Sequence, residues 1–436
     1  MGKLNYTVQP GGSLCGRLRA PGDKSISHRA VMLGSLADGL TRIQGFLEGA
    51  DCLATVDAFR GLGVTIEGPE QGHLIVHGVG MKGLREPATA LDMGNSGTGM
   101  RLLTGLLAGQ NFSSTLIGDE SLSRRPMRRI IEPLTRMGAS ISATEQGTAP
   151  LAIHGGQPLT GIEYAMPVAS AQVKSCLLLA GLYARGTTRI SEPAPTRDHT
   201  ERLLTGFGYA LERRDNHIVL NGGGHLHSCD IDIPADISSA AFFLVGASIA
   251  PDSDLLLEHV GINPTRTGII TLLKQMGANI IMSNERLSGG EPVADLRVRS
   301  APLHGIRIPE SLVPLAIDEF PAIFIAAAYA EGETVLSGAE ELRLKESDRI
   351  QVMADGLQAL GGVAQATPDG IVIQGGSLQG GAIDSHSDHR IAMAFALAAL
   401  RAEGAIQIAD CANVGTSFPR FVETARQAGL AVEARD

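Results

Sequence analysis

The chain of 436 residues is long enough for two or three domains, and its 44% hydrophobic content allows sizeable buried cores. A formal net charge of −10, the absence of Trp and an aromatic content of 4% argue against a nucleic acid or an anionic membrane as partner. The five cysteines include no pair at CxxC spacing, and the N-terminus has no apolar signal core. We therefore expect a cytoplasmic globular protein with free thiols and with no nucleic-acid or membrane partner.

A turn, a short polar cluster and then an apolar helix recur six times along the chain. The first copy opens at Pro21–Arg29, PGDKSISHR, and continues into the apolar segment Ala30–Leu36. Turn residues and serines before an apolar run are typical of a loop that leads into a helix N-terminus. The other copies are Asp92–Gly109, Pro167–Gly186, Pro234–Ala250, Ile317–Gly332 and Asp384–Gly404. Because these segments are apolar on nearly every side, we predict six fully buried helices.

An amphipathic helix that ends in glycine follows each apolar helix, and a short β-type run comes after it. The predicted segments are Cys52–Ile66, Arg125–Ile141, Thr196–Leu211, Thr265–Ile281, Lys345–Ala364 and Thr416–Val432. In five of them a Leu, Met or Phe is followed by glycine, at Gly63, Gly138, Gly208, Gly277 and Gly361. We expect a left-handed backbone at these glycines, since glycine commonly ends a helix in that conformation.

The spacing of the copies predicts the domain organisation. At roughly 70 residues the repeat is longer than a solenoid repeat, so each copy can form a small βαβαββ unit. Six units are too many for one core, and we predict an α/β (α+β) protein with two domains of three units each. The first domain would span residues 21–234. The second would be discontinuous and comprise residues 1–20 and 235–436, because Leu4–Leu18 is predicted to form strands that pair with the C-terminal half.

Basic residues gather at the starts of these repeats, although the protein as a whole is acidic. The polar helix starts contribute Lys24, Ser25, Arg29, Asn95, Gly97, Arg101, Ser170, Gln172, Asp388, His389 and Arg390, and the amphipathic segments open with Arg124, Arg125, Arg197, Lys345 and Arg349. Each cation alone is more typical of a solvated surface, but recurrence at equivalent repeat positions favours a ligand site. Arginines and helix N-termini together suit substrates that carry phosphate and carboxylate groups, and we expect them to face a cleft between the domains.

Two carboxylates, Asp318 and Glu346, stand among these cations. They either neutralise Lys345 and Arg349 or form the acid–base pair of a reaction on anionic substrates. The sequence shows no triad for covalent catalysis. The run GNSGTG at Gly94–Gly99 lacks the lysine of a phosphate-binding loop and does not open a dinucleotide fold of the usual pattern, so we expect no cofactor.

Histidines give little support for a metal site. Close pairs occur only at His225 with His227 and at His386 with His389, and no HExxH motif is present. Turn or surface histidines explain these pairs more simply than metal ligands do, and we expect no metal.

Seven motifs follow one another in a fixed order: PGDKSISHR, GNSGTGMR, SRRPM, ASAQVKS, AIDEFP, RLKESDR and SDHRIAMA. In this order they closely resemble the 5-enolpyruvylshikimate-3-phosphate synthase family over the full length, and most closely its bacterial members with ASAQVKS and TRDHT. The resemblance implies transfer of the enolpyruvyl group of phosphoenolpyruvate to the 5-hydroxyl of shikimate 3-phosphate, with release of phosphate, in the shikimate pathway toward chorismate and the aromatic amino acids. It also implies two domains of three βαβαββ units and closure of the interdomain active site on binding. We expect a monomer whose partners are these two small-molecule substrates.

The resemblance also implies roles for individual residues. Those expected to line shikimate 3-phosphate are Lys24, Ser25, Arg29, Ser170, Ala171, Gln172, Arg197, Asp318 and Lys345. Those expected to line phosphoenolpyruvate are Lys24, Asn95, Gly97, Arg125, Gln172, Arg349 and Arg390. The implied chemistry is addition followed by elimination, with Asp318 as the base for the 5-hydroxyl and Glu346, together with Lys24, as the proton carrier at C3. The sequence leaves open which of these groups carries which proton.

Two positions bear on the phosphoenolpyruvate pocket. Many relatives have a lysine just before a TFP or SFP motif near the C-terminus, whereas this chain has Thr416 in GTSFP. One cation of the pocket is therefore expected to be missing or replaced. Gly97 has no Cβ and lets a ligand lie close to the backbone. The resemblance implies that glyphosate competes with phosphoenolpyruvate for that space.

Two alternatives remain. The first is a UDP-N-acetylglucosamine enolpyruvyl transferase, a family with a similar repeat fold that uses a loop cysteine near the arginine motif; the corresponding loop here, Gly118–Arg125, has none. The second is a non-catalytic anion-binding repeat protein. Asp318 and Glu346 argue against it, because a passive anion site gains nothing from carboxylates.

Overall fold

The computed structural model describes residues 4–435, which form two compact units. Unit 1 comprises the described part of residues 1–21 together with residues 234–287 and the described part of 292–436. Unit 2 comprises Gly22–Ile233 and Ser288–Glu291. The chain therefore passes from unit 1 to unit 2 after Pro21 and returns at Pro234, beside the boundaries that the repeat pattern predicts.

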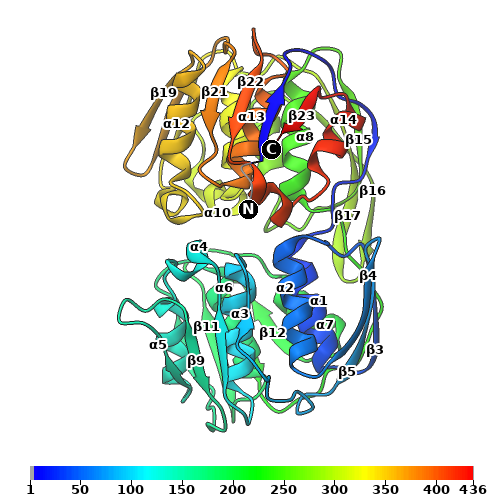
Figure 1. Cartoon of the computed structure of the whole chain (residues 1–436), viewed down its shortest axis with the longest axis vertical. Coiled ribbons are helices and arrows are strands. Elements are labelled where there is room, and N and C mark those ends of the chain that lie inside the picture. Colours follow the sequence, from blue (N-terminus) through cyan, green and yellow to red (C-terminus); the bar gives the residue numbers. More distant parts are fainter. Residues whose placement is uncertain (1–3, 436) are drawn as a thin grey trace. The chain divides into compact units, whose positions relative to one another are not determined.

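Within the described residues, unit 2 contains three four-stranded sheets of one topology (Figure 1). In each, the first strand runs parallel to the second, and the second and fourth strands run antiparallel to the third. The strand orders are β14 (Ile231–Asp232), β3 (Asp38–Gln44), β5 (His73–Val79), β4 (Thr65–Glu70); β6 (Leu91–Asp92), β7 (Ser114–Ile117), β9 (Leu151–His154), β8 (Ser140–Ser142); and β10 (Glu163–Ala165), β11 (Thr187–Ser191), β13 (His217–Asn221), β12 (Leu211–Arg214).

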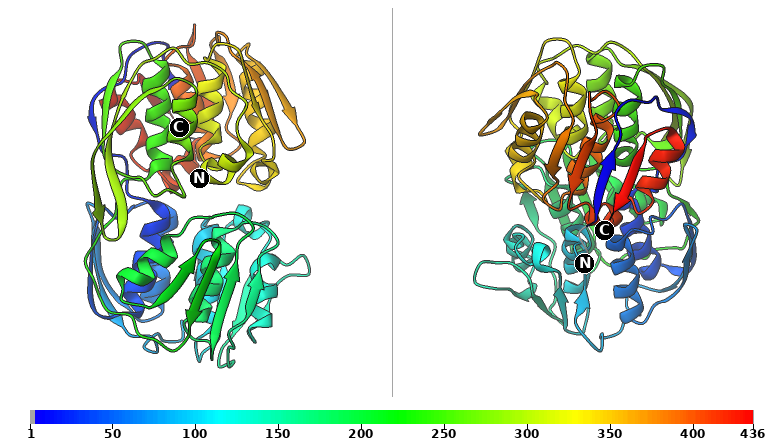
Figure 2. Two further views of the ribbon diagram at one scale, coloured as in Figure 1. Left: turned by 180° about the vertical axis from the view of Figure 1, so that it is seen from behind. Right: turned by 45° about the horizontal axis from the view of Figure 1, so that its top comes forward.

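Unit 1 also has three sheets in its described part, and two of them take in the N-terminal strands. Their orders are β21 (Gly381–Asp384), β22 (Ile406–Ala409), β1 (Asn5–Val8), β23 (Val432–Arg435); β16 (Asn279–Ser288), β17 (Glu291–Arg299), β15 (Asp254–Gly261), β2 (Cys15–Leu18); and β18 (Glu333–Leu336), β20 (Gly370–Gln374), β19 (Val363–Thr367). Figure 2 shows the blue β1 beside the red β23, from opposite ends of the chain. The predicted pairing of the N-terminal strands with the C-terminal half and the α/β (α+β) class are confirmed.

Six helices form the interiors of the two units, as the apolar segments predict. They are α1 (Lys24–Leu36), α3 (Gly97–Ala108) and α6 (Ala171–Gly181) in unit 2, and α8 (Ile237–Ile249), α11 (Phe320–Ala328) and α13 (His389–Ala398) in unit 1. Every residue of α8 and α11 is buried. In the other four, the partly exposed residues lie in the first turn, which leaves the helix start as the place where polar side chains are found.

The amphipathic helices and their glycine ends are also confirmed. These helices are α2 (Ala50–Gly61), α5 (Arg128–Arg136), α7 (His199–Gly206), α9 (Gly268–Gln275), α12 (Arg349–Ala359) and α14 (Phe421–Ala428). All five predicted glycines have φ between +78° and +103°. The remaining helical segments are short: α4 (Glu120–Ser123), α10 (Val313–Ala316) and the 3₁₀ turns η1 (Glu310–Leu312), η2 (Glu340–Leu344) and η3 (Ala412–Thr416).

Among the described residues, no single helix is both long and apolar enough to cross a membrane. The segments Glu310–Ala316 and Phe320–Ala328 reach that length and composition only as a pair bent by 119°. Every residue of the second segment is buried within its unit.

The contact between α3 and α6 in unit 2 predicts a strong effect of one methyl group. A Cβ at Gly105 of α3 would lie 2.2 Å from the carbonyl oxygen of Cys176 in α6. Backbone cannot rotate away as a side chain can, so Gly105→Ala must separate the helices and should lower the free energy of unfolding by about 1–3 kcal/mol. The control is Gly206→Ala at the end of α7, where nothing lies within 4 Å of the added Cβ. It should be neutral or stabilise by up to about 1 kcal/mol. Urea unfolding followed by circular dichroism measures both, and equal midpoints would contradict the prediction.

Candidate active site

Three apolar helices of unit 2 begin with capped polar turns. The side chain of Asp23 accepts a hydrogen bond from the Ile26 amide at the start of α1, at 2.9 Å. At the starts of α3 and α6, Ser96 and Ser170 accept from amides three residues ahead, at 3.0 and 3.4 Å. The caps satisfy only some of the terminal N–H groups, and the partial positive charge of each helix start remains.

Two predicted cations, Lys24 and Arg29, lie on the first turns of α1. Lys24 forms an ion pair with Asp51, a buried residue at the start of α2. Arg29 is only 4% exposed, and its Nη1 donates to the Ser25 carbonyl at 2.8 Å. Burial lowers the pKa of Arg29 to about 10, and the neighbouring charge of Arg197 also lowers it, against the raising effect of nearby carboxylates. The guanidinium therefore stays charged at neutral pH.

Gln172, on the first turn of α6, joins α6 to the start of α3. Its Oε1 accepts from Arg101 Nη1 at 2.9 Å and from Arg129 Nη2 at 3.0 Å, and its Nε2 donates to Thr98 Oγ1 at 3.0 Å. Arg101 is buried and also donates to the carbonyl of Gly97 at 3.3 Å. The hydrogen bonds from Arg101 and Arg129 orient the Gln172 amide, and they keep both guanidinium charges near the start of α3.

Arg125 lies on the other side of the same helix start. Its Nη2 donates to Asn95 Oδ1 at 2.7 Å, and its Nη1 to the Asn95 carbonyl at 3.3 Å. Asn95 in turn donates from Nδ2 to Asp119 Oδ2 at 2.8 Å. A Cβ on Gly97 would lie 2.9 Å from Arg101 Nη1 and 3.2 Å from Arg125 Nη1. Two arginines and the α3 start thus surround the position that has no side chain.

In unit 1, Arg349 at the start of α12 binds three carboxylates. Its Nε donates to Asp388 Oδ2 at 2.8 Å, its Nη2 to Glu346 Oε2 at 2.6 Å and its Nη1 to Asp318 Oδ1 at 3.4 Å. Burial lowers the pKa of Arg349, but the charges of Asp388, Glu346 and Asp318 outweigh burial and raise it above the usual value. The guanidinium is therefore a permanent positive charge around which the carboxylates are arranged.

Two further cations contact Asp318. Lys345 Nζ lies 3.4 Å from Asp318 Oδ1 and 3.0 Å from Glu341 Oε1. Arg390, on the first turn of α13, donates to the backbone carbonyl of Asp318 at 2.9 Å. Asp318 thus lies among Lys345, Arg349 and Arg390, and its contacts with Lys345 and Arg349 orient its carboxylate.

The three carboxylates around Arg349 differ in how far a ligand can reach them. The side chain of Asp388 is 0% exposed, caps α13 and accepts from the Arg390 amide at 2.9 Å. Burial raises its pKa, but the charges of Arg349 and His389 and the hydrogen bond from Arg349 together outweigh burial, so the pKa of Asp388 is lowered. The side chains of Asp318 and Glu346 are 14% and 27% exposed. Asp388 therefore holds Arg349 in place, whereas Asp318 and Glu346 can also meet a substrate.

Thr416 does not replace a cation. Its hydroxyl donates to the carbonyl of Asn413 at 2.8 Å, within the η3 turn. That the phosphoenolpyruvate pocket has one cation missing or replaced at this position stays a prediction.

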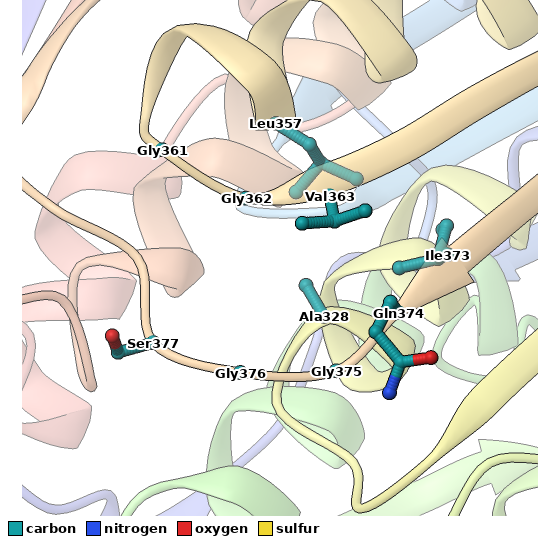
Figure 3. Close-up of a pocket in the computed structure, with 10 residues that line it drawn as sticks. All are labelled: Ala328, Leu357, Gly361, Gly362, Val363, Ile373, Gln374, Gly375, Gly376 and Ser377. Atoms are coloured by element: carbon teal, nitrogen blue, oxygen red, sulfur yellow. The ribbon is translucent and has the colours of Figure 1, made fainter.

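The cavity in Figure 3 lies elsewhere in unit 1 and has a volume of about 230 Å³. It is lined by Ala328, Leu357, Gly361, Gly362, Val363, Ile373, Gln374, Gly375, Gly376 and Ser377, and by none of the predicted site residues. The amides of its four glycines donate to backbone carbonyls. They are therefore not available to an anion, and the cavity is not a candidate for the substrate site.

Comparison with known proteins identifies the family. A family model described as EPSP synthase (3-phosphoshikimate 1-carboxyvinyltransferase) matches residues 8–425. The chain belongs to the EPSP synthase family. It is 68% identical to the 3-phosphoshikimate 1-carboxyvinyltransferase of Nitrosococcus oceani, covering 98% of this chain and 97% of the relative. It is 67% identical to that of Methylococcus capsulatus, covering 98% of both chains.

Solved structures agree with this membership. The structure of EPSP synthase from Acinetobacter baumannii aligns with a TM-score of 0.91 and 56% identity, covering 99% of this chain and 100% of the other. The enolpyruvyl transferase NikO from Streptomyces tendae aligns with a TM-score of 0.82 at 19% identity, covering 100% and 99%. The second similarity shows that the fold extends beyond the EPSP synthase family.

The predicted site residues form two groups, one in each unit. In unit 2, hydrogen bonds join Arg29 to Ser25 and Gln172 to the α3 start, while the charge of Arg197 lowers the pKa of Arg29. In unit 1, Asp318 contacts Lys345, Arg349 and Arg390 directly. Their roles toward each EPSP synthase substrate stay predictions.

Sequence reasoning assigned no role to three residues that organise these groups. Asp388 is the anchor of Arg349, and its place before the apolar helix His389–Ala398 could have marked it as a helix cap. Arg129, which binds Gln172 from another repeat, carries no local signal. His28 lies behind the α3 start, with Nδ1 2.7 Å from Thr55 Oγ1 and Nε2 3.4 Å from Ser96 Oγ.

The environment of His28 predicts a pH effect on stability. Burial, and then the charges of Lys24 and Arg29, lower the pKa of His28 to about 3. An unfolded histidine titrates near about 6.5, so below that pH the unfolded state binds a proton that the folded state does not. The free energy of unfolding should therefore fall as pH falls from about 6.5 toward 3. Between pH 7 and pH 4.5, the free energy of unfolding of His28→Gln should therefore fall by roughly 2.5 kcal/mol less than that of the wild type.

Urea unfolding at both pH values measures this effect. The control is His225→Gln in the same unit, which replaces an exposed histidine and should follow the wild-type profile. An equal loss in His28→Gln and wild type would show that His28 does not titrate as its burial requires.

Proposed function

We propose that the chain transfers the enolpyruvyl group of phosphoenolpyruvate to the 5-hydroxyl of shikimate 3-phosphate and releases inorganic phosphate. The observation that carries the proposal is the group around Arg349. There the carboxylates of Asp318, which also pairs with Lys345, and Glu346 are partly exposed. A site that only bound anions would gain nothing from these carboxylates. Full-length similarity to 3-phosphoshikimate 1-carboxyvinyltransferases supports the choice of substrates.

The residues of unit 2 suit the anionic groups of shikimate 3-phosphate. We assign Lys24, Ser25, Arg29, Ser170, Ala171, Gln172 and Arg197 to this substrate, together with Asp318 and Lys345 of unit 1. The starts of α1 and α6 add partial positive charge and backbone N–H groups that have no acceptor within the helix, and such groups bind phosphate well. Arg29 and Arg197 supply planar guanidiniums that can hold phosphate or carboxylate oxygens in pairs.

Phosphoenolpyruvate carries a phosphate and a carboxylate on a small carbon frame, and it needs cations on more than one side. We assign Lys24, Asn95, Gly97, Arg125, Gln172, Arg349 and Arg390 to it. Gly97 and the α3 start let the ligand approach the backbone between two arginines.

The proposed chemistry is addition followed by elimination. C3 of the enol takes a proton, the 5-hydroxyl oxygen attacks C2 as it loses its proton, and a tetrahedral ketal phosphate forms. Loss of phosphate and of one C3 proton then restores the double bond. Asp318, oriented by Lys345 and Arg349, is the proposed acceptor of the hydroxyl proton. Glu346 and Lys24 are the proposed proton carriers at C3, and Arg349 and Arg390 stabilise the charge on the departing phosphate.

This reaction needs no cofactor or metal, and the product leads toward chorismate and the aromatic amino acids. A cytoplasmic location and a monomeric state stay predictions. The UDP-N-acetylglucosamine reaction is not favoured, because the 118–125 loop has no cysteine and the similar proteins are 3-phosphoshikimate 1-carboxyvinyltransferases.

Phosphate release tests the proposal. Purified protein should release phosphate from phosphoenolpyruvate only when shikimate 3-phosphate is present, and the product should be the enolpyruvyl ether by mass spectrometry. No release with this pair, or release with UDP-N-acetylglucosamine instead, would contradict it.

The carboxylates provide the first functional prediction. Asp318→Asn and Glu346→Gln keep the shape of each side chain but remove its ability to transfer a proton. Each should lower kcat by roughly a hundredfold or more while the KM values change much less. Glu341→Gln is the matched control. Glu341 also pairs with Lys345, but its side chain is 46% exposed and it has no assigned proton transfer, so kcat should stay near that of the wild type. If either of the first two variants retains near-normal kcat, that residue is not the assigned proton carrier.

Gly97 provides the second. A methyl group there would press on the guanidiniums of Arg101 and Arg125 and narrow the space beside the α3 start. Glyphosate is slightly longer than phosphoenolpyruvate and should inhibit the wild type in competition with it. Gly97→Ala should raise the inhibition constant of glyphosate more than the KM of phosphoenolpyruvate, since the longer molecule meets the methyl first. Steady-state kinetics with both ligands decides this. Equal shifts, or a wild type insensitive at millimolar glyphosate, would refute it.

A further inference from the structure

The segment Thr196-Arg197-Asp198-His199-Thr200 of unit 2 buries four of its five side chains, and only Arg197 is half-buried. Four buried polar side chains beside one arginine are costly unless each finds a partner. Asp198 pairs with Arg202 and Arg213, and His199 pairs with Glu291. The two threonines have different partners. Thr200 bonds to Arg29, and Thr196 directly precedes Arg197.

Thr196, the residue directly before Arg197, is bonded to a buried cluster of ion pairs. Its hydroxyl donates to Glu192, and its carbonyl accepts from Lys174 Nζ at 3.4 Å. Lys174 Nζ also lies 2.9 Å from Glu192 Oε1 and 2.8 Å from Glu201 Oε1, and its side chain is 0% exposed. A lysine with two carboxylates in the interior is rigid, because breaking any pair would leave a buried charge uncompensated.

Thr200 anchors Arg29 in a closed triangle of hydrogen bonds. Thr200 Oγ1 accepts from Arg29 Nε at 2.6 Å and donates to Ser175 Oγ at 2.7 Å. Ser175 Oγ in turn accepts from Arg29 Nη2 at 2.8 Å. The triangle fixes one edge of the guanidinium.

Arg29, whose guanidinium is held by Thr200, and Arg197, whose chain is held at the preceding residue, repel one another. The charge of Arg197 lowers the pKa of Arg29, so each guanidinium feels the other. Without anchors, two such flexible side chains would move apart in the free protein, and a dianionic ligand would have to bring them together at the expense of its affinity.

We propose that Thr196 and Thr200 are positioning residues of the shikimate 3-phosphate site, Thr196 for Arg197 and Thr200 for Arg29. This inference rests on the proposed function, and it adds to that function the means by which the two arginines are held before the substrate arrives. Neither threonine needs to contact the substrate.

Two substitutions of equal shape test the proposal. Thr196→Val and Thr200→Val each remove one buried hydroxyl and keep the branched side chain. Each should raise the KM of shikimate 3-phosphate about tenfold, while the KM of phosphoenolpyruvate and kcat stay within about threefold of wild type. Thr200→Ser keeps the hydroxyl and should restore the wild-type KM.

The matched control is Thr104→Val in α3. Thr104 is also fully buried in unit 2, and among the described residues its hydroxyl bonds only to the Met100 carbonyl of its own helix. It should lose similar stability, measured as the thermal unfolding midpoint, without a change in either KM. An equal rise of the shikimate 3-phosphate KM in Thr104→Val, or wild-type KM values in both site variants, would overturn the proposal.

Failure of the proposed function looks different. Wild-type protein that releases no phosphate from the substrate pair would contradict the function itself, whereas active wild type with unchanged KM in both valine variants would contradict only the positioning role. If Thr200→Val unfolds below the assay temperature, Thr196→Val and its effect on the same KM decide the question.

Discussion

The internal packing of each unit depends on one constraint: the six repeat helices are apolar on nearly every side. Such a helix must be surrounded by other parts of its own unit, as α8 and α11 are, with every residue buried. Polar groups can then be tolerated only at its first turn, where capping side chains and unpaired amides are already present. Burial of the apolar helices therefore determines where cations, amides and carboxylates can collect, before any substrate is considered.

At those helix starts, charge is stabilised by opposite charge held at fixed distance. Arg349 is almost completely buried, and burial alone would favour its neutral form. The carboxylates of Asp388, Glu346 and Asp318 reverse that preference, and Asp388 is itself held ionised by Arg349. In unit 2, the caps Asp23, Ser96 and Ser170 have the corresponding role for the backbone. Each group remains charged or polar in the interior because its partner is held in place, by the same helix start for the three caps and by the start of α13 for the Arg349 partner Asp388.

Features set by local pattern could be predicted from the sequence, and those set by contacts across repeats could not. The buried helices and the left-handed Gly63, Gly138 and Gly208 follow from periodicity and from helix-end chemistry. Arg349 and Asp318 were found because cations and carboxylates recur at repeat starts. By contrast, Arg129 meets Gln172, and Lys174 meets Glu192 and Glu201, through tertiary packing. The pattern places Lys174 in a helix predicted to be buried, but nothing local identifies Glu192 and Glu201 as its partners.

The sequence left two interpretations for Asp318 and Glu346, neutralisation of cations or proton transfer, and the geometry makes these compatible. A carboxylate has two oxygens, and the Arg349 contacts use Oδ1 of Asp318 and Oε2 of Glu346. The partial exposure of both side chains leaves part of each group open to a ligand, in contrast with Asp388. An ion pair on one oxygen fixes the orientation of the group, and a proton acceptor must be oriented before it can act. The neutralising contact is therefore the means by which a catalytic carboxylate would be positioned, rather than evidence against that role.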